Sequence, residues 1–268
     1  MSNAALIDAL GTHHAPADGP ARIVSLVPSV TELLCDLGLG EQLVGRTGFC
    51  VHPREQLRDV TKVGGTKDIN LATLRDLRPT HVVLNVDENR RETADALAEF
   101  VPHLVVTHPQ GPGDNLPLYQ LLGGIFHCEA QAARLGRELR TRLAALENHQ
   151  ARPERKVLYL IWREPWMTVS RDTYIARMLQ LVNWQTVPES GEARYPVVEL
   201  TELADRPDLV LLSSEPYPFR DRHVPEIQAA LGESTPVHLI AGDMVSWYGS
   251  RAVAGVDYLA DFARQVAA

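Results

Sequence analysis

The chain has 268 residues, of which 45% are hydrophobic and 22% charged, a composition that is ordinary for a protein with a large core. Its formal net charge of −8 argues against nucleic acid or an anionic membrane as a partner, because either would require a basic face. No apolar run approaches the roughly 18 residues that span a bilayer, and three cysteines are too few for a disulfide framework.

Residues 1–20 form an opening stretch that we predict to be a flexible leader. They contain neither a basic n-region nor an apolar h-region, so they lack the pattern of a secretory signal. We therefore expect a cytoplasmic protein, or a periplasmic one if a native leader was removed.

Strands and helices alternate over residues 21–125. The run "RIVSLV" is apolar and β-branched without alternation, which predicts a buried strand. In the following "PSVTELLCDLG", Ser29 and Glu32 fit a capping box and Gly38 fits a C-terminal stop, which together predict a helix. The apolar runs "QLVGR", "HVVLNV" and "HLVVT" continue the alternation. This pattern predicts an N-terminal α/β lobe with a parallel sheet.

An Ala-, Leu-, Arg- and Glu-rich stretch predicts one long helix at residues 126–150. The alternation restarts at "KVLYLIW", which predicts a C-terminal α/β lobe at residues 151–268. The segments "LRDLRPTHVVLNVDEN" and "LTELADRPDLVLLSSEP" both combine a helix, an Arg-Pro pair, a buried strand and an acidic turn. This similarity favours two Rossmann-like lobes of like topology around the helix, although helix-Pro-strand is also a common α/β connection.

Polar and aromatic side chains follow the predicted strands, where ligands bind in open parallel sheets. The strand ends of the second half hold three of the four tryptophans, which favours a flat, partly apolar, hydrogen-bonding surface for a planar or large organic ligand. In the first half, a glycine-rich turn ("VGGTKD") adds backbone that a ligand can approach. The candidate ligand-binding residues are Cys50, His52, Lys67, Asp87, Glu88, Asn89 and Arg90 on the first lobe, and Trp162, Arg163, Trp166, Glu215, Tyr217, Trp247, Tyr248 and Arg251 on the second.

Cys50 and His52 lie two residues apart, so in an extended chain both side chains point to the same side and both could bind a metal. A protein metal site needs three or four ligands. Glu88, Glu215 or Asp243 could complete one, although nothing in the local sequence requires it.

The same pair, Cys50 and His52, raises the alternative of an enzyme that uses a catalytic thiol in a cleft. No orienting third group is visible, and neither a G-x-S-x-G motif nor a papain-type context surrounds the cysteine. Acid–base work by Asp87 or Glu88 with Glu215 is a further option, but acidic turn residues usually cap helices. We expect a protein that is not an enzyme.

The runs "RIVSLVPSVTELLCDLGLGEQLVG" and "KVGGTKDINLATLRDLRPTHVV", together with the long helix, resemble class III periplasmic binding proteins, the helical-backbone metal receptors. The resemblance covers residues 21–266 and is nearest to the cobalamin-binding branch of a family whose ligands are cobalamin, haem and ferric siderophores. It implies two α/β lobes joined by one rigid helix, little hinge motion, a ligand in the interlobe cleft, and no catalysis.

From the resemblance we expect a corrinoid or another metal chelate held between the two candidate sets, with no cofactor required. Aromatic side chains would stack on the ligand, Arg and Glu would fix its polar groups, and Cys50 or His52 would touch its metal. The sequence departs from the family at Thr66, where cobalamin receptors carry an aromatic residue, and near Ala72 and Ser246, where they carry glutamates that dock on the permease. We therefore expect an intracellular carrier or sensor, with the substrate-binding component of an ABC importer for cobalamin, haem or a siderophore as the alternative.

Overall fold

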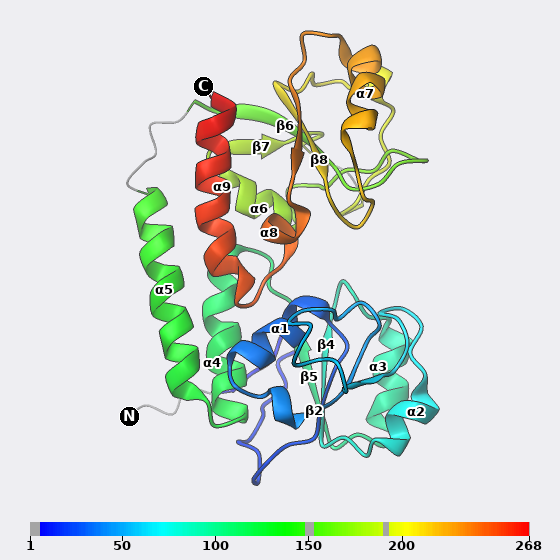
Figure 1. Ribbon diagram of the computed structural model, residues 1–268, viewed down its shortest axis with the longest axis vertical. Coiled ribbons are helices and arrows are strands. Elements are labelled where there is room, and N and C mark those ends of the chain that lie inside the picture. The colour runs from blue at the N-terminus through cyan, green and yellow to red at the C-terminus, as the bar shows by residue number, and fades with distance from the viewer. Residues whose placement is uncertain (1–5, 148–152, 190–192, 268) are drawn as a thin grey trace. The chain divides into compact units, whose positions relative to one another are not determined.

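The computed structural model describes residues 6–147, 153–189 and 193–267, and over these residues the chain divides into two compact units (Figure 1). As far as they are described, the first unit comprises Met1–Pro109, Asp114–Glu138 and Tyr248–Arg251. The second comprises Gln110–Gly113, Leu139–Trp247 and Ala252–Ala268. The chain therefore crosses between the units more than once, which the sequence did not predict.

Parallel strands form the sheet of the first unit, in the order β3-β2-β1-β4-β5. Every residue of β1 and β4 is buried, because a parallel strand covered on both faces has no solvated side and does not alternate. The strands are β1 (Ile23–Ser25), β2 (Leu43–Arg46), β3 (Thr61–Lys62), β4 (His81–Asn85) and β5 (His103–Thr107). The main helices are α1 (Pro28–Asp36), α2 (Leu71–Asp76), α3 (Arg91–Ala98) and α4 (Asn115–Ile125).

A second parallel sheet forms the second unit, in the order β7-β6-β8-β9. Its central strands β6 and β8 carry the core, which confirms the predicted class of two α/β lobes with parallel sheets. The strands are β6 (Arg155–Leu160), β7 (Trp184–Thr186), β8 (Leu209–Ser213) and β9 (Val237–Ile240). The helices are α6 (Tyr174–Gln180), α7 (Val224–Leu231), α8 (Gly242–Ser246) and α9 (Arg251–Ala267).

Helix α5 (Glu129–Glu147) is the predicted long helix that joins the lobes: it begins in the first unit and continues in the second. Residues 148–150 of the prediction lie outside the described residues. The helix begins three residues later than predicted because α4 and α5 are separated at His127, whose φ of 56° is incompatible with a continuous α-helix.

Helix α1 begins differently from the prediction. Pro28 occupies its first turn, where a missing N–H costs nothing, and no side chain caps this end. The predicted capping box of Ser29 and Glu32 is therefore wrong, and Glu32 instead accepts a hydrogen bond from Arg251 Nε at 2.8 Å. The predicted stop at Gly38 is confirmed by its φ of 85°.

The described part of the predicted leader, residues 6–20, is hydrogen-bonded to β5. Ala9 N donates to Val106 O at 2.9 Å, and Val106 N donates to the Asp8 carboxylate at 3.1 Å. Asp8 also accepts hydrogen bonds from the backbone of Leu10 and Thr12, so it organises this segment locally. The domain boundaries as such stay a prediction.

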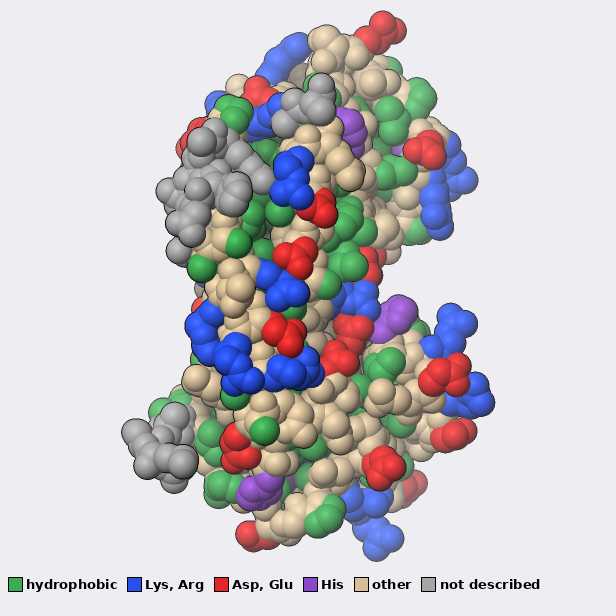
Figure 2. Space-filling model, turned by 60° about the vertical axis from the view of Figure 1, so that its left-hand side comes forward, with side chains coloured by type: hydrophobic (Ala, Val, Ile, Leu, Met, Phe, Trp, Pro, Cys, Tyr) green, Lys and Arg blue, Asp and Glu red, His purple; other side chains and the backbone are tan. Residues whose placement is uncertain are grey.

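Acidic and basic side chains are interspersed on the face shown in Figure 2. On α5, Arg134 pairs with Glu138 at 3.0 Å, while Arg142 pairs with Asp257 of α9 at 2.7 Å. Over the described ranges, none of the helices combines the length and apolarity needed to cross a membrane.

Candidate functional site

An acidic turn follows β4 in the first unit, and we call residues 86–90 the β4 turn. Asn85, the last residue of the strand, is buried and accepts hydrogen bonds from the backbone N–H of Asp87 at 2.8 Å and of Glu88 at 3.3 Å. The side chain of Asn85 therefore fixes the backbone that carries both carboxylates. Lys67 Nζ donates to the carbonyl of Asp87 at 2.8 Å, which joins the glycine-rich turn to the β4 turn.

Asn89 was expected to meet a ligand, but the structure gives it a structural role. Its side chain is buried, its amide nitrogen donates to the carbonyls of Leu26 and Thr66 at 3.2 and 3.0 Å, and its oxygen accepts from Asn85 N at 2.8 Å. These contacts hold the β4 turn against the end of β1. The expectation of direct ligand contact by Asn89 is corrected accordingly.

Glu88 accepts a hydrogen bond from the hydroxyl of Tyr248 at 2.7 Å. Burial raises the pKa of Tyr248 well above its ordinary value, and the nearby Glu88 carboxylate adds to the effect, so the hydroxyl stays protonated and acts as the donor. Tyr248 and Arg251 were expected on the second lobe, but both belong to the first unit. Arg251 binds Glu32 in a partly buried ion pair, so these residues hold the first unit together and do not extend the aromatic surface of the second.

Cys50 is fully buried, which corrects the expectation that it meets a ligand or a metal. Its sulfur lies 3.1 Å from Thr47 Oγ1, and burial raises the pKa of the thiol. His52 is exposed, so the two side chains do not share a surface. Among the described residues no group of three or more His, Cys, Asp or Glu side chains is placed to hold a metal ion.

Exposed apolar side chains flank Cys50, and sequence reasoning missed them. Phe49 is 63% exposed and Val51 46%, while Val86 after β4 is 44% exposed. The Phe49 ring lies over the glycine-rich turn, since a Cβ on Gly65 would be 3.3 Å from Phe49 Cε2. No strand covers residues 47–52, so the sequence offered no periodic signal for which of these side chains is exposed.

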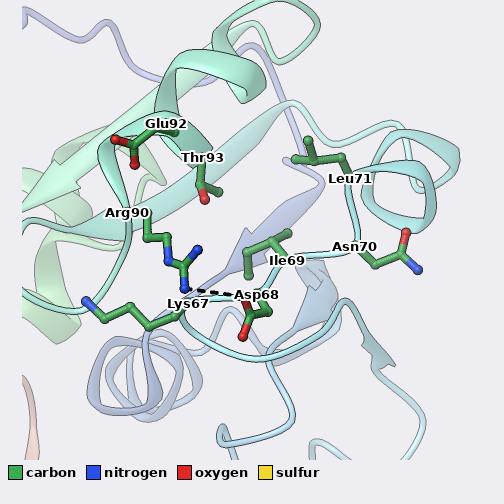
Figure 3. A pocket seen from close by; sticks show the side chains of 8 residues that line it. All are labelled: Lys67, Asp68, Ile69, Asn70, Leu71, Arg90, Glu92 and Thr93. Carbon is green, nitrogen blue, oxygen red and sulfur yellow. Dashed lines mark ion pairs between the residues drawn. The ribbon is translucent and has the colours of Figure 1, made fainter.

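A hollow of about 650 Å³ lies beside the glycine-rich turn in the first unit (Figure 3). Two of the candidate residues, Lys67 and Arg90, line it, and Arg90 lies 3.5 Å from the Asp68 carboxylate. The walls mix cations, carboxylates and apolar side chains, so the hollow has no single charge preference. Its lining residues are Lys67, Asp68, Ile69, Asn70, Leu71, Arg90, Glu92 and Thr93.

A second acidic turn follows β8 in the second unit, and we call residues 214–217 the β8 turn. Ser213, the last residue of the strand, donates to the carbonyl of Glu215 at 2.6 Å and accepts from its N–H at 3.4 Å. The Glu215 carboxylate accepts from Trp247 Nε1 at 2.6 Å and from Ser246 Oγ at 3.0 Å. Trp247 therefore positions Glu215, and its ring nitrogen is already engaged.

An aromatic cluster, formed by Trp162, Trp166, Tyr217 and Phe219, lies beside the β8 turn. Phe219 is buried, with Tyr217 4.7 Å away between ring centroids and Trp166 stacked at 6.1 Å. Trp162 contacts Tyr217 edge to face at 5.8 Å and is 41% exposed. The buried ring thus anchors an exposed one, which produces a rigid aromatic surface.

Two further exposed side chains near Trp162 were not predicted. Val197 is 56% exposed and Tyr195 38% exposed. Short β-bridges link Trp162 to Met167 and Met167 to Val197, so this segment runs alongside the cluster. The sequence hides this contact because more than thirty residues separate Trp162 from Val197.

Arg163 is fully engaged by acidic partners. Its guanidinium donates to both oxygens of Glu226 at 3.0 and 3.1 Å and lies 2.7 Å from the Glu164 carboxylate. The hydrogen bond with Glu226 raises the pKa of Arg163. The guanidinium carbon of Arg163 also lies 5.8 Å from the centroid of the Trp166 ring, so Arg163 stabilises the aromatic cluster through a cation–π contact.

Comparison with known proteins gives three relevant likenesses. A family model described as periplasmic binding protein matches residues 23–231. A vitamin B12-binding protein of Vibrio campbellii (strain ATCC BAA-1116) is 27% identical over 201 residues, which are 74% of this chain and 72% of the relative. The uncharacterized ABC transporter substrate-binding lipoprotein YvrC of Bacillus subtilis (strain 168) is 24% identical over 255 residues, 90% of this chain and 79% of the relative.

The fold has a close counterpart among solved structures. The periplasmic vitamin B12 binding protein BtuF of Vibrio cholerae matches with a TM-score of 0.79 and 17% sequence identity, covering 92% of this chain and 98% of that one. These relatives are named as binding or substrate-binding proteins, and none of the three as an enzyme. One is a lipoprotein and another periplasmic, so the expectation of a cytoplasmic location finds no support among them.

Proposed function

The chain belongs to the periplasmic binding protein family, and we propose that it binds a corrinoid or another planar metal chelate without transforming it. The observation that carries this proposal is the aromatic cluster of the second unit. Trp162 presents an exposed ring on a base of packed aromatic side chains, and a planar macrocycle gains most from such a rigid stacking surface.

The rigidity of this surface favours affinity. Tyr217 touches Trp162, Phe219 and His223, so its ring is fixed from several sides. A side chain that is already ordered loses little conformational entropy when a ligand binds. Vitamin B12-binding relatives support a corrinoid as the ligand.

Geometry disfavours the alternative of an enzyme that uses Cys50 and His52. A thiol attacks as its thiolate, and burial of Cys50 both blocks access and favours the protonated form. His52 is exposed, whereas the Cys50 sulfur is buried against Thr47 and Ser25. We therefore propose binding alone.

A spectral titration tests the proposal. The full chain is titrated with cyanocobalamin, dicyanocobinamide and haem, and affinity is measured by calorimetry. We expect saturable binding of at least one chelate and a loss of about tenfold in Trp162→Ala, since a stacked aromatic contributes about 0.5–1.5 kcal/mol beyond the area that it buries. Leu10→Ala, an exposed apolar position on the N-terminal segment, serves as control. If none of the three chelates binds, the proposal is wrong.

We further propose that the protein serves an ABC importer as its substrate-binding component. The lipoprotein relative, which covers 90% of this chain, supports this over an intracellular carrier. Deletion of the protein from its parent cells should then lower the uptake of labelled cobalamin. Unchanged uptake would favour the intracellular carrier.

A further inference from the structure

Residues 6–14 form a small loop on the outer edge of β5, and we call this loop the strap. Ile7 and His13 form an antiparallel bridge, and Leu6 packs against α4, because a Cβ on Gly124 would clash with the Leu6 side chain. Strand β5 is the last strand of its sheet, so the strap covers an edge that would otherwise present unpaired backbone groups. The strap, β5 and α4 all belong to the first unit.

The buried carboxylate of Asp8 is the centre of the strap. One of its oxygens accepts hydrogen bonds from the backbone N–H groups of Leu10 and Thr12, both at 2.9 Å, and the other accepts from Val106 N at 3.1 Å. His14 Nε2 lies 3.2 Å from this second oxygen, and the side chains of His14 and Asp8 are 5% and 0% exposed. Asp8 therefore takes the place that a carbonyl of a neighbouring strand would have on β5, and a buried imidazole holds it there.

Two further histidines lie at the amino ends of β4 and β5. His81 is buried, and its ring stacks on the His103 ring with 4.7 Å between the centroids. Phe126, which follows α4, contacts the His81 ring edge to face at 5.1 Å, and the Thr80 hydroxyl lies 2.9 Å from His81 Nδ1. His81 is therefore enclosed by β5 and the end of α4, with His14 of the strap near enough to act on its charge.

The groups around His81 disfavour its protonation. Burial is the largest cause that lowers the pKa of His81, to about 4, and His103 on β5 and His14 on the strap add to the effect. Before β1, the Arg22 guanidinium is bound to backbone carbonyls, and the Asp8 carboxylate is bound to His14. Because a buried charge is costly, protonation of His81 favours any arrangement in which water reaches the ring.

We propose that the strap is an acid-released latch: protonation of His81 drives the strap from the edge of β5, while the rest of the first unit stays folded. The strap is the removable part because it is a loop outside the sheet, whereas His103 lies in a strand and Phe126 caps a helix. Strap opening and protonation favour each other, because the state that hydrates the imidazole better binds the proton more tightly.

The direction of the pH dependence follows from His81. The latch is fully closed above about pH 6.5, where His81 is neutral in either state, and it loosens as the pH falls towards 4. This device goes beyond the proposed function and does not depend on it, since the strap holds no candidate ligand-binding residue.

Hydrogen exchange of the full chain without ligand, at pH 7.5 and at pH 5.0, tests the latch after correction for the intrinsic pH dependence of exchange. If His81 regains the ordinary histidine pKa of about 6.5 when the strap opens, the open population rises about 30-fold between these two pH values. We expect the protection of peptides that cover residues 6–14 to fall by that factor. At both pH values the strap should exchange faster than β1, because its opening needs no unfolding of the sheet.

Variants identify the groups responsible. His81→Gln and His81→Leu, which cannot titrate at this position, should make the protection of the strap equal at the two pH values. Asp8→Asn should loosen the strap at both, because it removes the charged partner of His14. His13→Leu is the matched control, since His13 is an exposed histidine of the same loop, and it should keep the pH dependence of the wild type. Thermal unfolding shows whether each variant folds.

Three outcomes would overturn the inference. Equal corrected protection of the wild-type strap at pH 7.5 and pH 5.0 would mean that its opening does not hydrate His81. Exchange of the strap as slow as that of β1 would mean that the strap leaves only when the whole unit unfolds. A pH dependence that persists in both His81 variants would assign it to another group.

Discussion

The β4 and β8 turns hold their glutamates alike but differ in what surrounds them. Charged and polar groups surround the β4 turn: Lys67 donates to its backbone, and His108 lies 3.4 Å from the Asp87 carboxylate. Aromatic rings surround the β8 turn, with Tyr217 inside it and Phe219 two residues beyond. A hydrogen-bonded glutamate therefore lies among polar groups in the first unit and beside aromatic rings in the second.

The difference begins with the last residue of each strand. Asn85 reaches two backbone N–H groups with one amide oxygen, whereas Ser213 has a short hydroxyl and contacts only Glu215 of its turn. The backbone of Gly242 packs closely against the β8 turn. A Cβ at this position would lie 2.8 Å from Glu215 Cγ, so only glycine fits without a shift. The strand-end side chain therefore contacts two residues of the first turn but only one of the second, and the second turn also depends on close packing against Gly242.

The largest effect is expected from removal of the strand-end residues. Asn85→Ala should lower the free energy of unfolding by about 2–4 kcal/mol. It leaves the part-buried N–H groups of Asp87 and Glu88 without their acceptor, which costs about 1–3 kcal/mol each. Ser213→Ala removes one short hydrogen bond to its turn and one of 3.4 Å, so it should cost about 1–2 kcal/mol. Urea denaturation measures both. Equal losses would contradict the view that the two turns are held differently.

The packing of the β8 turn can be broken directly. Gly242→Ala inserts a methyl group against Ser213 Oγ and Glu215, and overpacking of this kind costs about 1–3 kcal/mol. Gly113→Ala is the control, since no heavy atom lies within 4 Å of its added Cβ. Denaturation midpoints that match between the two variants would show that the close approach is unimportant.

The hydrogen bond from Tyr248 to the β4 turn should make the stability of the protein depend on pH above about pH 10. Because its pKa is raised on folding, Tyr248 contributes stability below the ordinary tyrosine pKa of about 10, and this contribution is lost as the pH rises above that value. Tyr248→Phe should cost about 1 kcal/mol at pH 8 and make the decline above pH 10 shallower. An identical decline in wild type and variant would rule out the assignment.

A further effect concerns the other end of β4. That strand begins with the buried His81, where β8 begins with Leu209. Burial and the neighbouring His103 and His14 lower the pKa of His81 to about 4, so the folded first unit resists its protonation. Stability is therefore full above about pH 6.5 and falls by about 1.4 kcal/mol per pH unit as the pH drops towards 4.

His81→Leu, which copies the residue at the start of β8, should reduce this acid sensitivity. Unfolding at pH 7.0 and pH 5.5 provides the measurement. A wild-type chain that is equally stable at both values would contradict the assignment of His81 as a buried neutral histidine.

Local patterns in the sequence predicted the fold well. Continuous apolar runs identified the parallel strands, and composition identified α5, because both signals arise from neighbouring residues. The start of α1 was mistaken because the partner of Glu32 is Arg251, 219 residues away. No local pattern carries that information.

The candidate site was less predictable for the same reason. Trp162 and Tyr217 were found from their place after strands, which is a rule of topology. Tyr248 was assigned to the wrong unit because a crossing of the chain at residues 247–248 depends on contacts with Asn115, Tyr119 and Glu88. Phe49 was overlooked because the cysteine and histidine beside it suggested metal chemistry.

Hydrogen exchange of the full chain with and without saturating dicyanocobinamide tests the central claim most directly, since it reports on the aromatic cluster and the β8 turn at once. The account predicts protection in peptides that cover residues 162–166 and 214–217, with unchanged exchange at residues 6–14, which carry no candidate contact. Absence of protection from both segments would contradict it.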